Sequence, residues 1–215
     1  MIAFFNWFTK ITGWPVYFPL FRTKVHYEDK EVQSRRIKGP AIIICNHTSV
    51  FDYAVMLFVF FTRTIRAQMA EILFEKKGPL PLFLKLMGGI KVDRTTHDFG
   101  FMEETAEVLR KGGVVLIFPE SRIPLPEEER PLPFVPSAAL SAIQAQVPVI
   151  PVYTNGSYFK KKRAEVIIGT PINVADQVTR EMKEDEKIKQ VTQVFRERII
   201  RLQEELDVKE NEKRK

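Results

Sequence analysis

AIIICNHTSVFD, residues 41–52, joins a strand pattern to a helix pattern, and the rest of the chain is organised around it. Residues 41–45 are apolar without interruption, which is typical of a strand buried in the middle of a sheet. The run ends at Asn46 and His47, and an apolar pattern that predicts a helix over residues 49–61 follows. Open α/β sheets place their chemistry where the carboxyl end of a strand meets a helix. The chemistry of this chain is therefore expected around His47.

His47 and Asp52 can meet only in one local arrangement. Residues five apart on a straight helix diverge by roughly 140°, so His47 must precede the helix and Asp52 must lie in its first turn. Ser49 is a favoured N-cap residue, and Asp52 follows it by three positions, as in a capping box. Asp52 would then accept the Nδ1 proton of His47 and leave Nε2 free as a base. The alternative is an ordinary loop histidine beside an aspartate that favours the positive end of the helix.

The composition is that of one globular domain. A chain of 215 residues that is 45% hydrophobic and 28% charged supports one sizeable core. Cys45 is the single cysteine, which excludes an internal disulfide and is consistent with a reducing compartment. At the end of a buried strand it is expected to be a small buried hydrophobe rather than a nucleophile. The net charge of +6 favours anionic partners, but no nucleic-acid-binding motif accompanies it, so we do not expect nucleic acid as a partner.

The first 21 residues are crowded with aromatic side chains. These are Phe4, Phe5, Trp7, Phe8, Trp14, Tyr17, Phe18 and Phe21. Pro15 and Pro19 interrupt the ~20 apolar residues that a membrane span needs, and the signature of a signal peptide is missing. Aromatic rings suit the headgroup region of a bilayer, and nearby basic residues can meet anionic lipid: Lys10, Arg22 and Lys24. We expect residues 1–24 to be a helical segment in the membrane interface; the alternative is a helix packed into the core.

Strand and helix patterns alternate beyond residue 24. Strands are predicted over residues 41–45, 64–69, 90–92, 114–118, 149–153 and 164–168, and helices over residues 49–61, 80–87, 101–110, 137–145 and 185–206. This order predicts a single α/β domain, residues 25–208, with a mostly parallel sheet covered by helices. The charged tail, residues 209–215, is expected to fray. The helix over 49–61 is apolar on nearly all sides, so it is expected either deep in the core or against lipid.

Polar residues that follow three of these strands resemble the motifs of the glycerolipid acyltransferase family, best known for its 1-acylglycerol-3-phosphate acyltransferases. The first family block, N-H-x-x-x-x-D, is matched by Asn46–Asp52, which carries the His-x4-Asp motif. The second, a glycine, an apolar strand and an arginine, is matched by Gly89–Arg94, and the fourth, V-P-(V/I)-(V/I)-P, by Val147–Pro151. The third, F-P-E-G-T-R-S, is matched by Phe118–Arg122, which is one residue shorter and lacks the glycine. The resemblance covers roughly residues 41–171.

The resemblance implies an enzyme of phospholipid biosynthesis that moves a fatty acyl group from a thioester to the hydroxyl of 1-acylglycerol-3-phosphate or a related lysophospholipid. Such a transfer needs a base for the hydroxyl proton and positive or donor groups for the developing oxyanion. His47 oriented by Asp52 would supply the base. No serine or cysteine lies in a recognisable nucleophile elbow, which favours direct transfer over an acyl-enzyme.

The other candidate site residues lie at the ends of the later strands. Arg94, with Lys91 near it, is expected to bind the acceptor phosphate; its alternative is a surface ion pair with Asp93. Arg122 is a further phosphate ligand, although the shortened third block leaves its correspondence to the family arginine open. Glu120 and Ser121 are expected to orient the acceptor, and the alternative for Glu120 is an ion pair within the loop.

Neither a metal nor a redox cofactor is implied, because the three histidines have no ligand spacing and no glycine-rich nucleotide loop is present. The expected partners are a phospholipid membrane surface, a lysophospholipid acceptor, and acyl-CoA or acyl carrier protein as the thioester donor. We expect a peripheral, monotopic protein on the cytoplasmic face of the cell membrane. Residues 160–163, KKKR, form a solvated turn or add attraction to anionic lipid. The alternative function is a catalytically weak lipid-binding or membrane-organising protein with the same fold.

Overall fold

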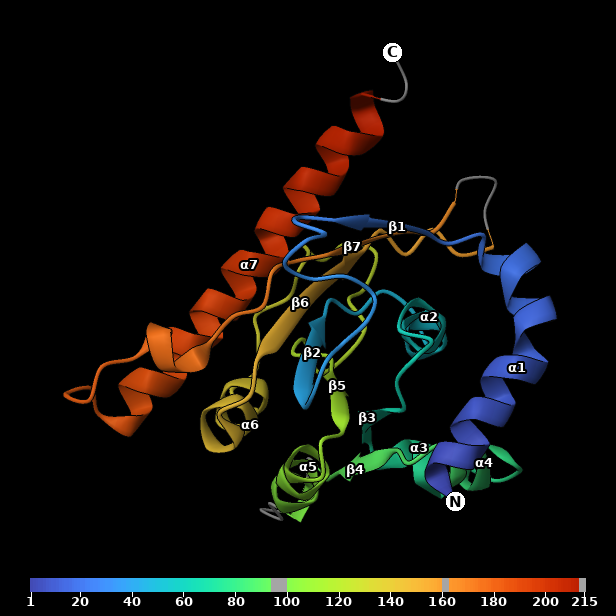
Figure 1. Cartoon of the computed structure of the whole chain (residues 1–215), viewed down its shortest axis with the longest axis horizontal. Coiled ribbons are helices and arrows are strands. Elements are labelled where there is room, and N and C mark those ends of the chain that lie inside the picture. The colour runs from blue at the N-terminus through green and yellow to red at the C-terminus, as the bar shows by residue number, and fades with distance from the viewer. Residues whose placement is uncertain (94–99, 160–162, 213–215) are drawn as a thin grey trace.

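Figure 1 shows the computed structural model, which describes residues 1–93, 100–159 and 163–212. In these residues seven strands form one sheet in the order β1-β7-β6-β2-β5-β3-β4. They are β1 (Lys24–Tyr27), β2 (Ala41–Cys45), β3 (Ile65–Ala70), β4 (Ile90–Val92), β5 (Val114–Ile117), β6 (Val149–Thr154) and β7 (Glu165–Ile168). Only the β6–β7 pair among them is antiparallel. The predicted mostly parallel sheet of a single domain is therefore confirmed.

Helices cover both faces of the sheet (Figure 1). They are α1 (Ile2–Phe21), α2 (Asp52–Val59), α3 (Ile72–Glu75), α4 (Leu80–Leu86), α5 (Gly100–Arg110), α6 (Ser137–Ala145) and α7 (Glu184–Glu212), with a 3-10 turn, η1, at Val174–Gln177. Helices α1 and α2 lie on one face, and α5, α6 and α7 on the other. This arrangement leaves the edge where the parallel strands end for the polar residues that follow them.

Strand β2 lies at the centre of the sheet, between β5 and β6. All five of its residues are buried. Because successive side chains of a strand point to opposite faces, Ile43 and Cys45 join the core under α1 and α2, whereas Ile42 and Ile44 join the core under α5, α6 and α7. The uninterrupted apolar run of the sequence is thus explained by burial on both faces.

Helix α2 belongs to the core and not to a lipid-facing surface. It begins at Asp52, later than predicted, and ends at Val59. Val55 and Met56 within it are fully buried. Val50 and Phe51, which precede its first turn, are exposed. The alternative of a lipid-facing helix is therefore wrong for α2; only the two residues that precede it are exposed.

Helix α1 runs without a break through Pro15 and Pro19. The ring of Tyr17 stacks on Phe58 of α2 at a centroid distance of 4.0 Å, and Phe21 is also buried. Large apolar side chains on its outer side are exposed: Phe4, Trp7, Phe8, Ile11, Trp14, Val16, Phe18 and Leu20. One side of α1 thus packs on the domain while the other remains uncovered. In the described part of the chain, no helix is both long and apolar enough to span a bilayer.

Two features of the fold differ from the sequence prediction. The short helix α3 was not predicted. Helix α7 continues to Glu212, so residues 209–212 belong to it and not to a frayed tail. The Nζ of Lys209 donates to the carbonyl of Tyr27 at 3.0 Å, and Asn155 donates to Glu210 at 2.9 Å. These contacts to the body extend the helix beyond its last apolar positions.

Candidate active site

The carboxyl ends of β2, β5 and β6 meet at one edge of the sheet because these three strands run parallel. The backbone N–H of His47, after β2, donates to Glu120 Oε1, after β5, at 2.7 Å. The side chain of Asn46 makes two bonds to Thr154, the last residue of β6: its Nδ2 donates to the carbonyl at 2.9 Å, and its Oδ1 accepts from the amide at 2.8 Å. Three strand ends are thus tied together around His47.

The predicted contact between His47 and Asp52 is present. Nδ1 of the imidazole lies 2.8 Å from Asp52 Oδ2, with the carboxylate fully buried and the His47 side chain 20% exposed. An ionised carboxylate only accepts hydrogen bonds, so Nδ1 carries the proton and Nε2 has the lone pair. Within the described residues no hydrogen bond to Nε2 is present, which leaves this nitrogen available as a base.

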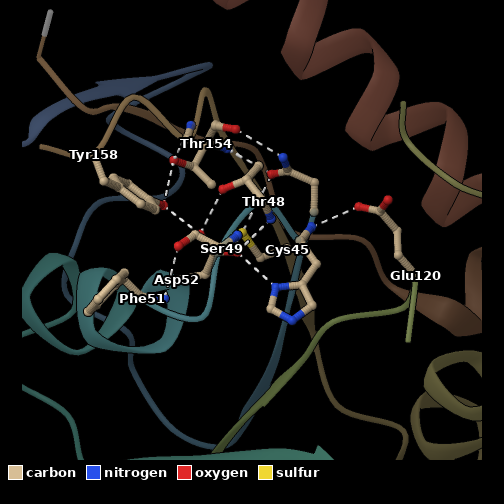
Figure 2. A network of polar contacts seen from close by, with 11 residues as sticks. Cys45, Thr48, Ser49, Phe51, Asp52, Glu120, Thr154 and Tyr158 are labelled. Carbon is tan, nitrogen blue, oxygen red and sulfur yellow. Dashed lines mark hydrogen bonds and ion pairs between the residues drawn. The ribbon is translucent and has the colours of Figure 1, made fainter. Parts of the chain in front are cut away.

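Asp52 accepts four further hydrogen bonds (Figure 2). The amides of Thr48 and Ser49 donate to Oδ2 at 2.6 and 2.9 Å, and the hydroxyls of Thr48 and Tyr158 donate to Oδ1 at 2.8 and 2.7 Å. The bond from Ser49 N to Asp52 is the one expected in a capping box, but the prediction of Ser49 as the N-cap is wrong: the N-cap of α2 is Phe51, which has no side-chain cap bond. The Ser49 hydroxyl accepts from Phe51 N at 3.3 Å rather than from Asp52. The buried charge of Asp52 is therefore compensated by donors on both oxygens.

A cavity of about 330 Å³ lies next to this site, at Phe118. Phe118, which lines it, stacks on the His47 ring with centroids 4.4 Å apart and planes inclined by 19°. Most of its wall is apolar, with polar groups from Gln68, Asp93, Ser121 and Ser137. Ligand sites of this size and character are common in proteins, with a few polar groups that orient the ligand.

The buried carboxylate of Glu120 links two backbone segments of the site. Besides His47 N, its carboxylate accepts from Leu132 N at 2.8 Å. Burial raises the pKa of Glu120, although the two N–H donors oppose the shift. The structure pairs Glu120 with these two amides and not with Arg122, so the alternative of an ion pair within the loop is wrong. Its predicted role with the acceptor remains a prediction.

The predicted phosphate ligands lie in different surroundings. Both terminal nitrogens of Arg122 bind the carboxylate of Glu128, at 2.7 and 2.5 Å, in a largely exposed ion pair. Lys91 is half-exposed, with its Nζ 3.6 Å from Glu71. Arg94 and residues 160–162 lie outside the described residues. Ser121 lines the cavity, with a left-handed φ of 63°.

Cys45 is buried beside this network, and burial together with the charges of Asp52 and Glu120 raises the pKa of its thiol. This confirms its expected character as an inert buried hydrophobe. Among the residues that the structure describes, no group of three or more His, Cys, Asp or Glu side chains could hold a metal ion.

Thr154, Tyr158 and Phe118 take part in the site but are absent from the sequence prediction. Phe118 was visible in the third block, but only as a match to the motif. The one local signal for Tyr158 is the Asn155–Gly156 pair, which favours a turn after β6.

Comparisons with known proteins agree with this geometry. Residues 23–155 match a family model described as Acyltransferase. The chain is 27% identical over 165 residues to human 1-acyl-sn-glycerol-3-phosphate acyltransferase beta, covering 74% of this chain and 58% of that protein. It is 25% identical over 171 residues to 1-acyl-sn-glycerol-3-phosphate acyltransferase of Bacillus subtilis, covering 77% of this chain and 82% of that protein.

A crystal structure of the 1-acyl-sn-glycerophosphate acyltransferase PlsC from Thermotoga maritima has a similar fold. The TM-score is 0.62 at 21% sequence identity, over 94% of this chain and 79% of that one. The likeness in fold therefore extends over nearly the whole chain.

Proposed function

Because the chain belongs to the glycerolipid acyltransferase family, we propose that it moves a fatty acyl group from a thioester to the hydroxyl of 1-acyl-sn-glycerol-3-phosphate or a related lysophospholipid. The observation that carries this proposal is the buried Asp52 carboxylate on Nδ1 of His47, with Nε2 available at the strand-end edge of the sheet. The named relatives act on 1-acyl-sn-glycerol-3-phosphate. The chain spans 58% of the human relative.

The geometry supports a direct transfer. Nε2 of His47 takes the proton of the acceptor hydroxyl while the oxygen of that hydroxyl attacks the thioester carbonyl carbon. The tetrahedral oxyanion then collapses, the C–S bond breaks, and the leaving thiolate receives the proton from the imidazolium. Asp52 stabilises the imidazolium and fixes its orientation throughout. Cys45 is buried and its raised pKa keeps it a thiol, so it offers no competing nucleophile.

The cavity beside Phe118 is the proposed binding site of the acceptor. Its wall includes Phe118, which stacks on the His47 ring, and Val92 and Asp93 at the end of β4. Arg94 follows in the sequence and remains the proposed phosphate ligand, with Lys91 near it. Arg122 is the weaker candidate, because its guanidinium already binds Glu128 through two nitrogens.

Attachment to a membrane surface is supported by the uncovered side of α1. Phe4, Phe8 and Phe18 are each more than half exposed, and they belong to the helix that also packs on α2. Burying such side chains at a bilayer interface is favourable, whereas leaving them in water is not. We propose a monotopic protein that takes its acceptor from the bilayer, on the cytoplasmic face, with acyl-CoA or acyl carrier protein as the donor.

The second candidate function is a lipid-binding protein with weak catalysis. It is favoured by the third block, where Arg122 is turned to Glu128 and one residue of the family motif is missing. This candidate requires acceptor binding without product.

The test is mass spectrometry of lipids formed by the purified protein from a panel of lysolipids, with acyl-CoA and acyl carrier protein donors supplied separately. Phosphatidic acid from 1-acylglycerol-3-phosphate is the expected product. Arg94→Ala should raise the KM for this acceptor far more than the KM for the donor, while Arg122→Ala should change both little. Vesicle and lysolipid binding without any acylated product would support the second candidate instead.

A further inference from the structure

Tyr158 contacts the catalytic pair from a distant part of the chain. Its hydroxyl lies 2.7 Å from Asp52 Oδ1 and 3.0 Å from Thr154 Oγ1, and the residue is 6% exposed. Because the carboxylate only accepts, the single phenolic proton points to Asp52. The hydroxyl of Thr154 must then donate to Tyr158. Figure 2 shows Tyr158 on the side of Asp52 away from Glu120.

The two oxygens of Asp52 are held by different parts of the molecule. Oδ2 accepts from the imidazole of His47 and the amides of Thr48 and Ser49, all within the same loop. Oδ1 accepts from the Thr48 hydroxyl and from Tyr158, which is 106 residues away. Of these described donors, Tyr158 alone comes from outside residues 47–49. It therefore fixes the carboxylate relative to β6, and not merely relative to its own loop.

The turn after β6 is shaped to bring Tyr158 to this place. Gly156 has a φ of 63°, and a Cβ there would lie 2.6 Å from Thr48 Oγ1. This turn therefore requires glycine, both for its conformation and for its close approach to the catalytic loop. The ring of Phe21 packs edge-on against Tyr158 with centroids 5.5 Å apart. Backbone and ring are both restrained, so the hydroxyl has little freedom to leave Asp52.

We propose that Tyr158 is a positioning residue whose hydroxyl holds the Asp52 carboxylate in the orientation that keeps the His47 proton on Nδ1 and Nε2 available as the base. Its effect on turnover rests on the function proposed above. Burial and the charge of Asp52 raise the pKa of Tyr158, so it stays a protonated donor across the neutral range. The backbone of Thr154 is hydrogen-bonded to the Asn46 side chain, and the Thr154 hydroxyl donates to the Tyr158 hydroxyl. Thr154 therefore helps to hold the Tyr158 hydroxyl in place.

The experiment compares Tyr158→Phe with Tyr53→Phe in the full-length protein. Tyr53 is the control, since its hydroxyl donates to the carbonyl of Ile65 at 3.1 Å and to neither His47 nor Asp52. Tyr158→Phe loses the bond to Asp52 and the bond from Thr154, whereas Tyr53→Phe loses one bond, so the melting temperature should fall further in Tyr158→Phe. Turnover is measured with 1-acylglycerol-3-phosphate and acyl-CoA, and the Nδ1 proton of His47 is followed by NMR, assigned by its absence in His47→Gln.

Tyr158→Phe is expected to lower kcat about tenfold or more, a part of the 10²–10⁴-fold that a positioned base contributes. The KM values should change little, and the Nδ1 proton signal should shift or broaden. Tyr53→Phe should alter neither kcat nor this signal. If Tyr158→Phe does not fold, Thr154→Val removes the donor to Tyr158 and should give a smaller change in the same direction.

An unchanged Nδ1 signal overturns the proposal, whether or not kcat falls, because a fall in kcat alone would then reflect stability. A shifted signal with unchanged kcat overturns it as well. If the wild-type protein transfers no acyl group from any donor, the NMR comparison still decides whether Tyr158 orients the pair. That outcome would separate a failure of the proposed function from a failure of this inference.

Discussion

The loop of residues 46–52 and helix α1 bury and expose polar and apolar groups in opposite ways. In the loop the polar side chains of Asn46 and Asp52 are buried, and each finds partners. In α1 large apolar side chains are exposed, while Asn6 and Lys10 are fully buried. Lys10 donates to the carbonyls of Phe61 and Arg63, beyond the end of α2. The prediction that Lys10 meets anionic lipid is therefore wrong, because its ammonium group is buried between α1 and the chain that follows α2.

The difference shows what each region is built for. Burying a carboxylate is unfavourable unless donors surround it, and in the function proposed above these donors hold Asp52 on His47. Helix α1 exposes aromatic rings and buries a lysine. Its outer side therefore gains no stability from contact with water. Its uncovered surface is suited to the interface of a bilayer, where apolar side chains gain and basic side chains meet headgroups.

The largest effect that would sharpen this contrast is on membrane binding. Replacing Phe4, Phe8, Ile11 and Phe18 together by serine removes exposed side chains, each worth about 1 kcal/mol or more when buried at an interface. Partition of the protein into anionic vesicles should fall about a hundredfold or more, as measured by sedimentation. The melting temperature should hardly change, because these side chains are exposed.

The matched control is Val208→Ser, which removes an exposed apolar side chain from α7. It should leave vesicle binding unchanged. Deletion of residues 1–21 is a poorer test, because it also removes Tyr17 and Phe21 from their contacts with Phe58 and Tyr158. Complete sedimentation of the fourfold variant would mean that α1 is not the attachment surface.

An intermediate effect is expected in the loop. Glutamine at position 120 offers one oxygen, so one of the two N–H groups of His47 and Leu132 would face an amide NH₂. Glu120→Gln should lower the free energy of unfolding by about 1–3 kcal/mol, the range for an unsatisfied buried donor. Urea unfolding checks this value, with Glu128→Gln in the exposed ion pair as the control expected to lose less. A loss for Glu120→Gln that is smaller than the loss for Glu128→Gln would show that the loop does not depend on the two hydrogen bonds of Glu120.

The last effect is confined to alkaline pH and concerns Lys10. Burial lowers the pKa of Lys10 from 10.5 to about 8. Between these two values the unfolded chain holds a proton that the folded protein has released, so the free energy of unfolding should rise with pH. Lys10→Met should lack this contribution, whereas Lys85→Met, at an exposed position, should keep it. Identical pH dependence in the wild-type protein and Lys10→Met would argue against a buried cation in α1.

The sequence was sufficient where the interactions are local. The strand over residues 41–45 and the contact between His47 and Asp52 depend on neighbours within a few positions, and both were predicted. Tyr158 was not, because its partner Asp52 lies 106 positions away and nothing local to it indicates that contact. Likewise, α1 is apolar around most of its circumference, so its pattern could not show which side packs on the domain.

Arg122 shows a different limit of sequence reasoning. The motif placed it near the acceptor, but a carboxylate six residues further along the chain, Glu128, binds its guanidinium. The shortened third block leaves the role of Arg122 open, but its pairing with Glu128 is not visible in the motif alone.

The most direct test of the central claim is the turnover of His47→Ala, with acyl transfer to 1-acylglycerol-3-phosphate followed by mass spectrometry. His47 is partly exposed in a loop, so its removal should leave the melting temperature close to that of the wild-type protein. Product formation should fall about 10²–10⁴-fold, the contribution of a positioned general base. Near-normal turnover by a folded His47→Ala protein would contradict the account, since no other described residue would then explain the reaction.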